Sequence, residues 1–295
     1  MKKVVRMLGL CALVALAFTS CKKKETGSTI TFKATMPQTV SDSRTHMDES
    51  QYVVWDDNDK ICVINDDASD YINSVVKTID TYGTGATFEG DAAFLGDITT
   101  DGMYYAFYPT TYNTKGEPTV SMTIPASQTF KAKSFDTNLY PMFAANEGTG
   151  FQFRSDAGLL TIPITKGQET QNSFTVGRIV VEAYNHEDEL VGTMTYAHNA
   201  PNMSNPTYTK SNTSYTVELT GCDLLGEIGV DDRQFNFVLM EGALTGEFKV
   251  TLYDPLDNII PILDANNTPH DFIVGSTPRG IIAQQRIRMN PITLR

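Results

Sequence analysis

The stretch Thr29-Ile30-Thr31-Phe32-Lys33-Ala34-Thr35-Met36 alternates strictly between polar and apolar residues. Successive side chains of a β-strand point to opposite faces, so Ile30, Phe32, Ala34 and Met36 share one face. The pattern predicts a strand with one buried and one solvated face. Further short runs with the composition of strands, such as Met103 to Tyr108, follow along the chain and are separated by Gly, Asn, Asp and Pro.

Helical periodicity is nearly absent, which indicates an all-β fold. The 275 residues that follow the first 20 exceed the usual size of a single domain. The polar stretch Ala145 to Gly150 is the best linker, and we place a boundary near residue 147. We therefore expect two antiparallel β-sandwich domains in tandem, an N-terminal one at 29–147 and a C-terminal one at 148–295.

The first 20 residues have the form of an export signal. A basic start with Lys2, Lys3 and Arg6 precedes an apolar stretch from Met7 to Phe18, which is too short for a spanning helix. Phe18-Thr19-Ser20-Cys21 then resembles the lipobox of bacterial lipoproteins, which predicts cleavage before Cys21 and lipidation of its sulfur. The alternative is an ordinary secretory signal followed by a coincidental cysteine.

Charge limits the choice of partners. The whole chain carries a formal net charge of −12, and loss of the three basic residues of the signal leaves 20 basic against 35 acidic residues, or −15. Phosphate binding needs a basic footprint, and the one basic cluster, Lys22 to Lys24, lies beside the expected lipid. We therefore expect no nucleic-acid partner, and residues 21–28 read as a flexible tether at the membrane surface.

Catalytic and cofactor motifs are missing from the sequence. His46, His186, His198 and His270 are scattered, without zinc-binding spacing, and we expect them to lie in exposed loops. No nucleophile elbow or phosphate-binding glycine loop occurs, so we predict a non-enzymatic protein without metal or cofactor, although carboxylates distant in sequence could still pair as they do in glycosidases. Cys62 lies in an apolar, strand-like run and is predicted to be a buried thiol rather than a partner of Cys222 in a disulfide.

Each of two features near residue 55 could have either a binding role or a structural role. Asp56-Asp57-Asn58-Asp59 is rich in carboxylates, as calcium sites are, but it lacks the EF-hand ligand spacing. A tight hairpin turn between Val53–Trp55 and Ile61–Val63 accounts for the same residues and is favoured. Trp55 is predicted to be a core anchor rather than a sugar-stacking platform.

Several segments in the same order resemble the fimbrillin family of Bacteroidota, the building blocks of type V pili. They are Ser43-Arg44-Thr45, Trp55 to Val63, Ala86 to Gly90 and Tyr105 to Pro109, followed by Phe151-x-Phe153 with Leu159 to Ile164. The resemblance spans most of the chain in short pieces. Asp57-Asn58-Asp59 departs from it, because the family more often has Gly-Asp at that turn.

The resemblance implies two transthyretin-like sandwich domains, outer-membrane export as a lipoprotein, and assembly with other pilus subunits. It also implies that an arginine-specific protease cuts after an arginine, at the position of Arg44 here. The cut would free the first strand, with Ile30, Phe32, Ala34 and Met36, and a strand of the next subunit would fill the groove.

The C-terminal segment carries an alternation that fits a donor strand, with Ile281, Ala283, Ile287 and Met289 on one face. Gln285 interrupts that face and Pro291 ends it, so the segment could instead close its own domain. A second function stays open, namely a surface glycan-binding lipoprotein of a carbohydrate-uptake system, because the chain has 29 aromatic residues including Trp55. That function needs an exposed aromatic platform.

Overall fold

A computed structural model describes residues 29–36, 46–47, 53–66, 71–91, 102–109, 119–132, 134–166, 175–184, 188–197, 208–222, 233–264, 266, 268–277 and 279–294. Cys21 and Arg44 lie outside these ranges. Within them the regular structure is almost entirely β, apart from short 3-10 turns such as η2 (Thr137–Leu139). The predicted all-β class is confirmed.

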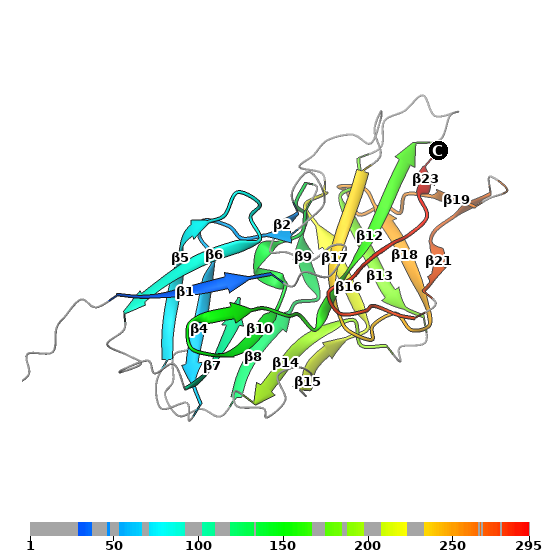
Figure 1. Cartoon of the computed structure of the whole chain (residues 1–295). Helices are drawn as coiled ribbons and strands as arrows, with labels where there is room; N and C mark the ends of the chain where they lie inside the picture. The colour runs from blue at the N-terminus through cyan, green and yellow to red at the C-terminus, as the bar shows by residue number, and fades with distance from the viewer. Residues whose placement is uncertain are drawn as a thin grey trace, which may run out of the picture.

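The N-terminal part of the chain builds a seven-stranded sheet (Figure 1). Its strand order is β10 (Met142–Glu147), β7 (Met103–Tyr108), β4 (Lys60–Asn65), β5 (Tyr71–Ile79), β6 (Gly85–Asp91), β1 (Thr29–Thr35) and β11 (Gly150–Gln152). Neighbouring strands are antiparallel except β1 and β11, which are parallel. β1, the blue strand of Figure 1, therefore lies inside the sheet and not at its edge.

The two end strands of this sheet meet. Phe143 of β10 and Arg154, two residues beyond β11, exchange both backbone hydrogen bonds at 2.8 Å each. This bridge closes the sheet on itself around a core that includes Phe32, Phe88 and Trp55. Removal of β1 would consequently open a gap in a closed structure.

Three further sheets and one small ribbon complete the fold. The six-stranded sheet has the order β17 (Arg233–Met240), β12 (Ala157–Lys166), β23 (Ile292–Leu294), β19 (Ile262–Leu263) and β20 (Pro269–His270), with β22 (Arg286–Arg288) also on β12. The five-stranded sheet has the order β21 (Ile273–Ser276), β18 (Glu247–Tyr253), β13 (Arg178–Ala183), β16 (Thr216–Thr220) and β9 (Ser127–Thr129). The smaller ones are β15 (Tyr208–Ser214), β14 (Val191–Ala197) and β8 (Thr119–Ile124), and the pair β2 (His46–Met47) and β3 (Val53–Val54).

Strand pairing crosses residue 147 in both directions. β8 and β9 precede this residue but pair with β14 and β16, whereas β11 follows it and pairs with β1. The stretch 145–150, predicted to be a linker, forms the end of β10 and the turn into β11. The division into domains at 29–147 and 148–295 stays a prediction, and the strands on either side of its boundary share sheets.

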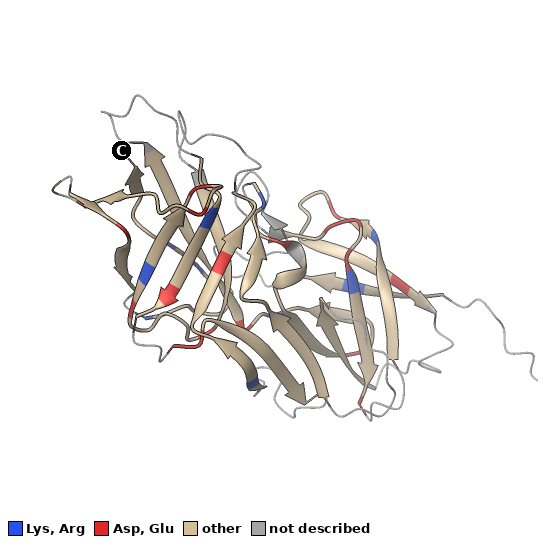
Figure 2. Ribbon diagram, turned by 180° about the vertical axis from the view of Figure 1, so that it is seen from behind, with Lys and Arg blue, Asp and Glu red and all other residues tan. Residues whose placement is uncertain are grey.

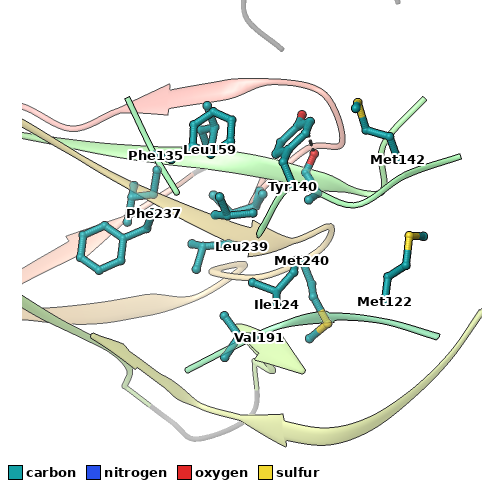
Figure 3. Packing of buried hydrophobic residues seen from close by; sticks show 14 of the residues in the cluster. Met122, Ile124, Phe135, Tyr140, Met142, Leu159, Val191, Phe237, Leu239 and Met240 are labelled. Atoms are coloured by element: carbon teal, nitrogen blue, oxygen red, sulfur yellow. Dashed lines mark hydrogen bonds between the residues drawn. The ribbon is translucent and has the colours of Figure 1, made fainter. Parts of the chain in front are cut away.

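A continuous apolar core lies between the sheets of the C-terminal part (Figure 3). Leu159 of β12 and Phe237 and Leu239 of β17 pack there against Phe135 and Tyr140. Two buried side-chain amides, those of Gln128 and Asn236, join the segment around Gln128 and Ser134 to β17. The Gln128 side chain donates to the Val238 carbonyl at 2.7 Å and accepts its N–H at 3.0 Å, and Asn236 donates to the Ser134 carbonyl at 2.9 Å.

The predicted hairpin between Val53–Trp55 and Ile61–Val63 is wrong. The turn itself exists, because Asp59 donates its backbone N–H to the Asp56 carbonyl at 3.0 Å. However, β3 pairs with β2, while β4 pairs with β5 and β7. The Trp55 N–H instead reaches the Gly83 carbonyl at 3.0 Å, so the chain on the two sides of the turn joins different partners.

Candidate functional site

The first strand occupies a groove between two partners. β1 pairs antiparallel with β6 over seven residues, from Thr29 opposite Asp91 to Thr35 opposite Gly85. On its other side it runs parallel to β11, where the Lys33 N–H donates to the Thr149 carbonyl at 2.8 Å. The Phe153 N–H donates to the Thr35 carbonyl at 2.9 Å. Both edges of the groove, β6 and β11, thus have backbone hydrogen-bonding groups that are paired only when a strand lies between them.

The inward side chains of β1 fill four positions of different size. Phe32 is fully buried, lies opposite Phe88 and is 5.8 Å from Phe151 between ring centroids. Ala34 is 1% exposed and lies opposite Ala86, so this position is narrow. Met36 is buried and Ile30 is half-buried. The prediction that these four residues share the inward face is confirmed, and their release remains a prediction.

Aromatic rings form the floor of this core. Trp55 is 2% exposed, and its ring lies 5.0 Å from Phe88 and 5.5 Å from Phe153 and Tyr108, each at a steep angle. Such edge-to-face contacts are typical of packed aromatic cores. The predicted role of Trp55 as a core anchor is confirmed. A sugar-stacking platform built around Trp55 is not formed.

The segment that joins β1 to the rest of the chain contains Arg44. Met36 ends the described stretch, its N–H donating to the Thr84 carbonyl at 3.0 Å, and β2 begins at His46. Arg44 itself lies outside the described residues. A cut after it would separate β1 from β2, which pairs with β3 and would stay with the body of the protein.

The acidic turn holds one carboxylate inside the protein. Asp59 is buried and accepts the Tyr108 hydroxyl at 2.7 Å and the Asp56 N–H at 2.7 Å. Burial and the charge of Asp59 raise the pKa of Tyr108, so the phenol keeps its proton and donates it. Asp59 thereby caps the turn from inside. Among the described residues, no group of three His, Cys, Asp or Glu side chains stands where it could hold a metal ion.

The predicted donor segment does not form one continuous strand. Ala283 and Gln284 lie in a turn, Gln284 has a φ of 60°, and only β22 and β23 are strands beyond it. The expectation of a single alternating strand over Ile281, Ala283, Ile287 and Met289 is therefore wrong. Ile281 is fully buried, whereas Ala283, Ile287 and Met289 are half-buried.

The C-terminal segment is bound to β12 of its own chain. β22 and β23 both run parallel to β12, on the side opposite β17. A Cβ atom on Gly158 would lie 2.5 Å from the Ile282 carbonyl oxygen and 2.9 Å from that of Gln285, so only glycine permits this approach. The Arg286 side chain donates to the Thr161 hydroxyl at 2.7 Å and to the Gln234 side chain at 2.6 Å.

Sequence reasoning missed the partner strand β11. Phe151 and Phe153 belong to the predicted C-terminal domain at 148–295, but they line the β1 groove beside Phe32. Their spacing of two was a usable signal, since it matches the alternation of a strand with one apolar face. Which sheet they join depends on a pairing between residues more than 100 positions apart, and no local pattern reports it.

The remaining predictions concern thiols, histidines and charge. Cys62 is a buried free thiol, as predicted, and Cys222 is buried and free as well. His270 is exposed, with a ring nitrogen 3.2 Å from the Asp264 carboxylate, but it lies on β20 and His46 lies on β2, so the expectation that these two histidines lie in loops is wrong. His186 and His198 lie outside the described residues. Figure 2 shows Lys and Arg on separate strands, interspersed with Asp and Glu. No helix in the described part of the chain is long and apolar enough to cross a membrane.

No protein-family model and no curated protein sequence matches this chain. Solved structures do. A "putative cell adhesion protein" of Bacteroides ovatus aligns with a TM-score of 0.53 at 11% identity, over 90% of this chain and 92% of that one. A protein of the same description from Bacteroides uniformis aligns with a TM-score of 0.51 at 14% identity, over 90% and 93%. The fold of this protein is thus one that proteins named for cell adhesion also have, as the fimbrillin resemblance implies.

Proposed function

We propose that this protein is a non-enzymatic cell-surface subunit of a fimbrillin-like pilus or adhesion assembly. Cleavage after Arg44 frees β1, and a strand of another subunit takes its place. The observation that carries the proposal is the location of β1, an interior strand whose side chains complete the core, with Arg44 in the stretch of sequence between it and the strands that follow.

The physics of the replacement follows from the groove. Departure of β1 leaves the edges of β6 and β11 without partners and uncovers the pockets of Phe32, Ala34 and Met36. Exposed apolar surface costs about 25 cal/mol per Å², and unpaired strand edges bind other strands readily. A donor strand restores both the backbone hydrogen bonds and the pocket contacts.

The export signal supports the outer membrane as the location of this assembly. Lipid on Cys21 would anchor the protein in the outer membrane, and residues 22–28 would act as a polar tether. The tether precedes β1, so a cut after Arg44 would also release the body of the protein from its lipid. Anchoring and processing are therefore alternatives for one molecule, and the uncut form is the membrane-bound one.

Cleavage by an arginine-specific protease tests the proposal. The expected result is a new N-terminus at Thr45, followed by loss of β1 and capture of an added peptide with the sequence of residues 29–36. Arg44→Lys is the matched control, because it keeps the charge and removes the cleavage site. A cleaved chain that loses β1 and captures no strand would contradict the proposed function.

A further inference from the structure

We infer that this chain accepts a donor strand but does not donate its own C-terminal strand, so that it ends a polymer and its donor is a different protein. The inference rests on the proposed function and adds the identity of the partner. Two independent observations carry it. One is the way the C-terminal segment is held, and the other is the shape of the β1 groove.

The C-terminal segment is an interior part of its own sheet. Ile281 donates its N–H to the Ala243 carbonyl at 2.6 Å and accepts the Gly242 N–H at 2.9 Å. Ile292 and Leu294 are buried between β12 and β19. Withdrawal of the segment would leave one whole side of β12 without a partner, so donation would open a second groove in the donor.

The segment also does not fit the β1 groove. The four positions filled by Ile30, Phe32, Ala34 and Met36 accept, in order, a medium, an aromatic, a small and a long side chain. The segment offers Ile281, Ala283, Gln285, Ile287 and Met289 on one face. Every alignment that fills all four positions, in either direction, puts Gln285 at the position of Phe32 or of Ala34.

Both of these positions are closed to solvent, since Phe32 and Ala34 are at most 1% exposed. The residues in register with them, Phe88, Ala86 and Phe151, carry no polar side-chain atom that could bind an amide. A buried amide without a partner opposes binding strongly. In its own fold, by contrast, the Gln285 side chain is exposed.

The groove therefore selects a strand with the pattern apolar, x, aromatic, x, small, x, apolar. A subunit that accepts such a strand but keeps its own C-terminal strand is joined to one donor subunit, and it has no strand with which to join a second subunit. Growth of the polymer stops at this subunit. The donor is a strand of another polypeptide that carries an Ala or Gly two residues after an aromatic residue.

Peptide capture by the full chain, cleaved after Arg44 and separated from β1, tests the inference. Three labelled peptides are compared by fluorescence anisotropy, namely residues 29–36, the same peptide with Ala34→Gln, and residues 281–289. We expect the first to bind, the second to bind at least about tenfold more weakly because of the buried amide, and the third not to bind. Equal binding of the first two, or binding of the third, would overturn the inference.

A disulfide lock provides a second measurement. Thr165 and Thr293 are register partners on β12 and β23, with hydroxyl oxygens 3.4 Å apart, and cysteines at both positions would fasten the C-terminal strand. Locked and reduced forms should capture the 29–36 peptide equally, and neither should polymerise alone. Polymers that form only in the reduced state would overturn the inference and leave the proposed function standing. Failure of all three peptides to bind would overturn both.

Discussion

Phe143 and Arg154 exchange two backbone hydrogen bonds of 2.8 Å, and this pair joins the chain just beyond β11 to β10 without involving β1. The next residue towards β11, Phe153, donates its N–H to the Thr35 carbonyl of β1 instead. The hydrogen bonds of two adjacent amides therefore depend on different strands, that of Phe153 on β1 and that of Arg154 on β10. One side of the β1 groove is fastened to β10, so the groove can keep its shape when β1 leaves.

This arrangement predicts a local exchange pattern. After cleavage and loss of β1, exchange of the Phe153 amide should accelerate by at least about tenfold, because its acceptor is gone, while the Arg154 amide stays protected. Hydrogen exchange followed by nuclear magnetic resonance measures the exchange rates of the Phe153 and Arg154 amides separately. Addition of the 29–36 peptide should restore protection at Phe153. Loss of protection at both amides would show that β11 depends on β1.

Phe32→Ala should destabilise the uncut protein by about 3–5 kcal/mol, the usual cost of removing a buried aromatic ring from a core. Lys33→Ala is the matched control, because Lys33 is the next residue of the same strand and is exposed. It should change the unfolding free energy by less than about 0.5 kcal/mol. Urea unfolding measures both, and similar effects of the two changes would contradict the inward orientation of Phe32.

Gly158→Ala should loosen the C-terminal segment, because the added methyl group would press on the Ile282 and Gln285 carbonyl groups. We expect a loss of about 1–3 kcal/mol and faster proteolysis after residue 280. Gly150→Ala is the control, since its Cβ would have one neighbour, the Asn146 side chain at 3.8 Å. Unchanged proteolysis in Gly158→Ala would argue against a tight docking of the segment on β12.

Asp156 should make stability depend on pH. The pKa of its carboxyl is raised from 3.8 to about 6, mainly by burial and to a smaller extent by the Glu241 charge, while the Tyr196 hydroxyl that donates to it at 3.1 Å partly offsets the rise. The folded state thus holds this proton more tightly than the unfolded state. Stability from this group is present below pH ~4 and is lost as pH rises to ~6, by up to ~3 kcal/mol.

Asp156→Asn removes this titration and keeps an oxygen for Tyr196. The difference in unfolding free energy between the variant and the wild type should therefore grow in favour of the variant between pH 4 and 6, and then stay level. Denaturant unfolding at several pH values measures it. A difference that is constant over this window would mean that Asp156 titrates normally in the folded protein.

Cys21→Ala should move the uncut protein from the membrane to the soluble fraction, since lipid on this sulfur is the expected source of its membrane affinity. Labelling with a fatty-acid analogue should mark the wild type and not the variant. Cys62→Ala, which removes a buried thiol, is the control and should leave labelling unchanged. Equal labelling of Cys21→Ala and wild type would refute lipidation at this residue.

Local sequence alone determined which residues of each strand point inward. The alternation from Thr29 to Met36 identified Phe32, Ala34 and Met36 as buried, and the apolar run around Cys62 and the position of Trp55 identified them as core, because the two-residue period of a strand is a local property. The same reasoning recognised the turn at Asp56 to Asp59. It also recognised the all-β class.

Only the tertiary structure decided which strands are neighbours. β1 lies beside β11, and β8 and β9 join sheets of the C-terminal half. β3 pairs with β2 and not with β4. The local sequence of each of these strands indicates a strand but not its partner. The turn at Gln284 that breaks the C-terminal alternation has the same origin. It brings Gln285 beside Gly158, and the backbone contacts to β12 outweigh the preference of the segment for one straight strand. Pairing between distant strands depends on the combined burial of all of them, and that sum is not a property of any short stretch.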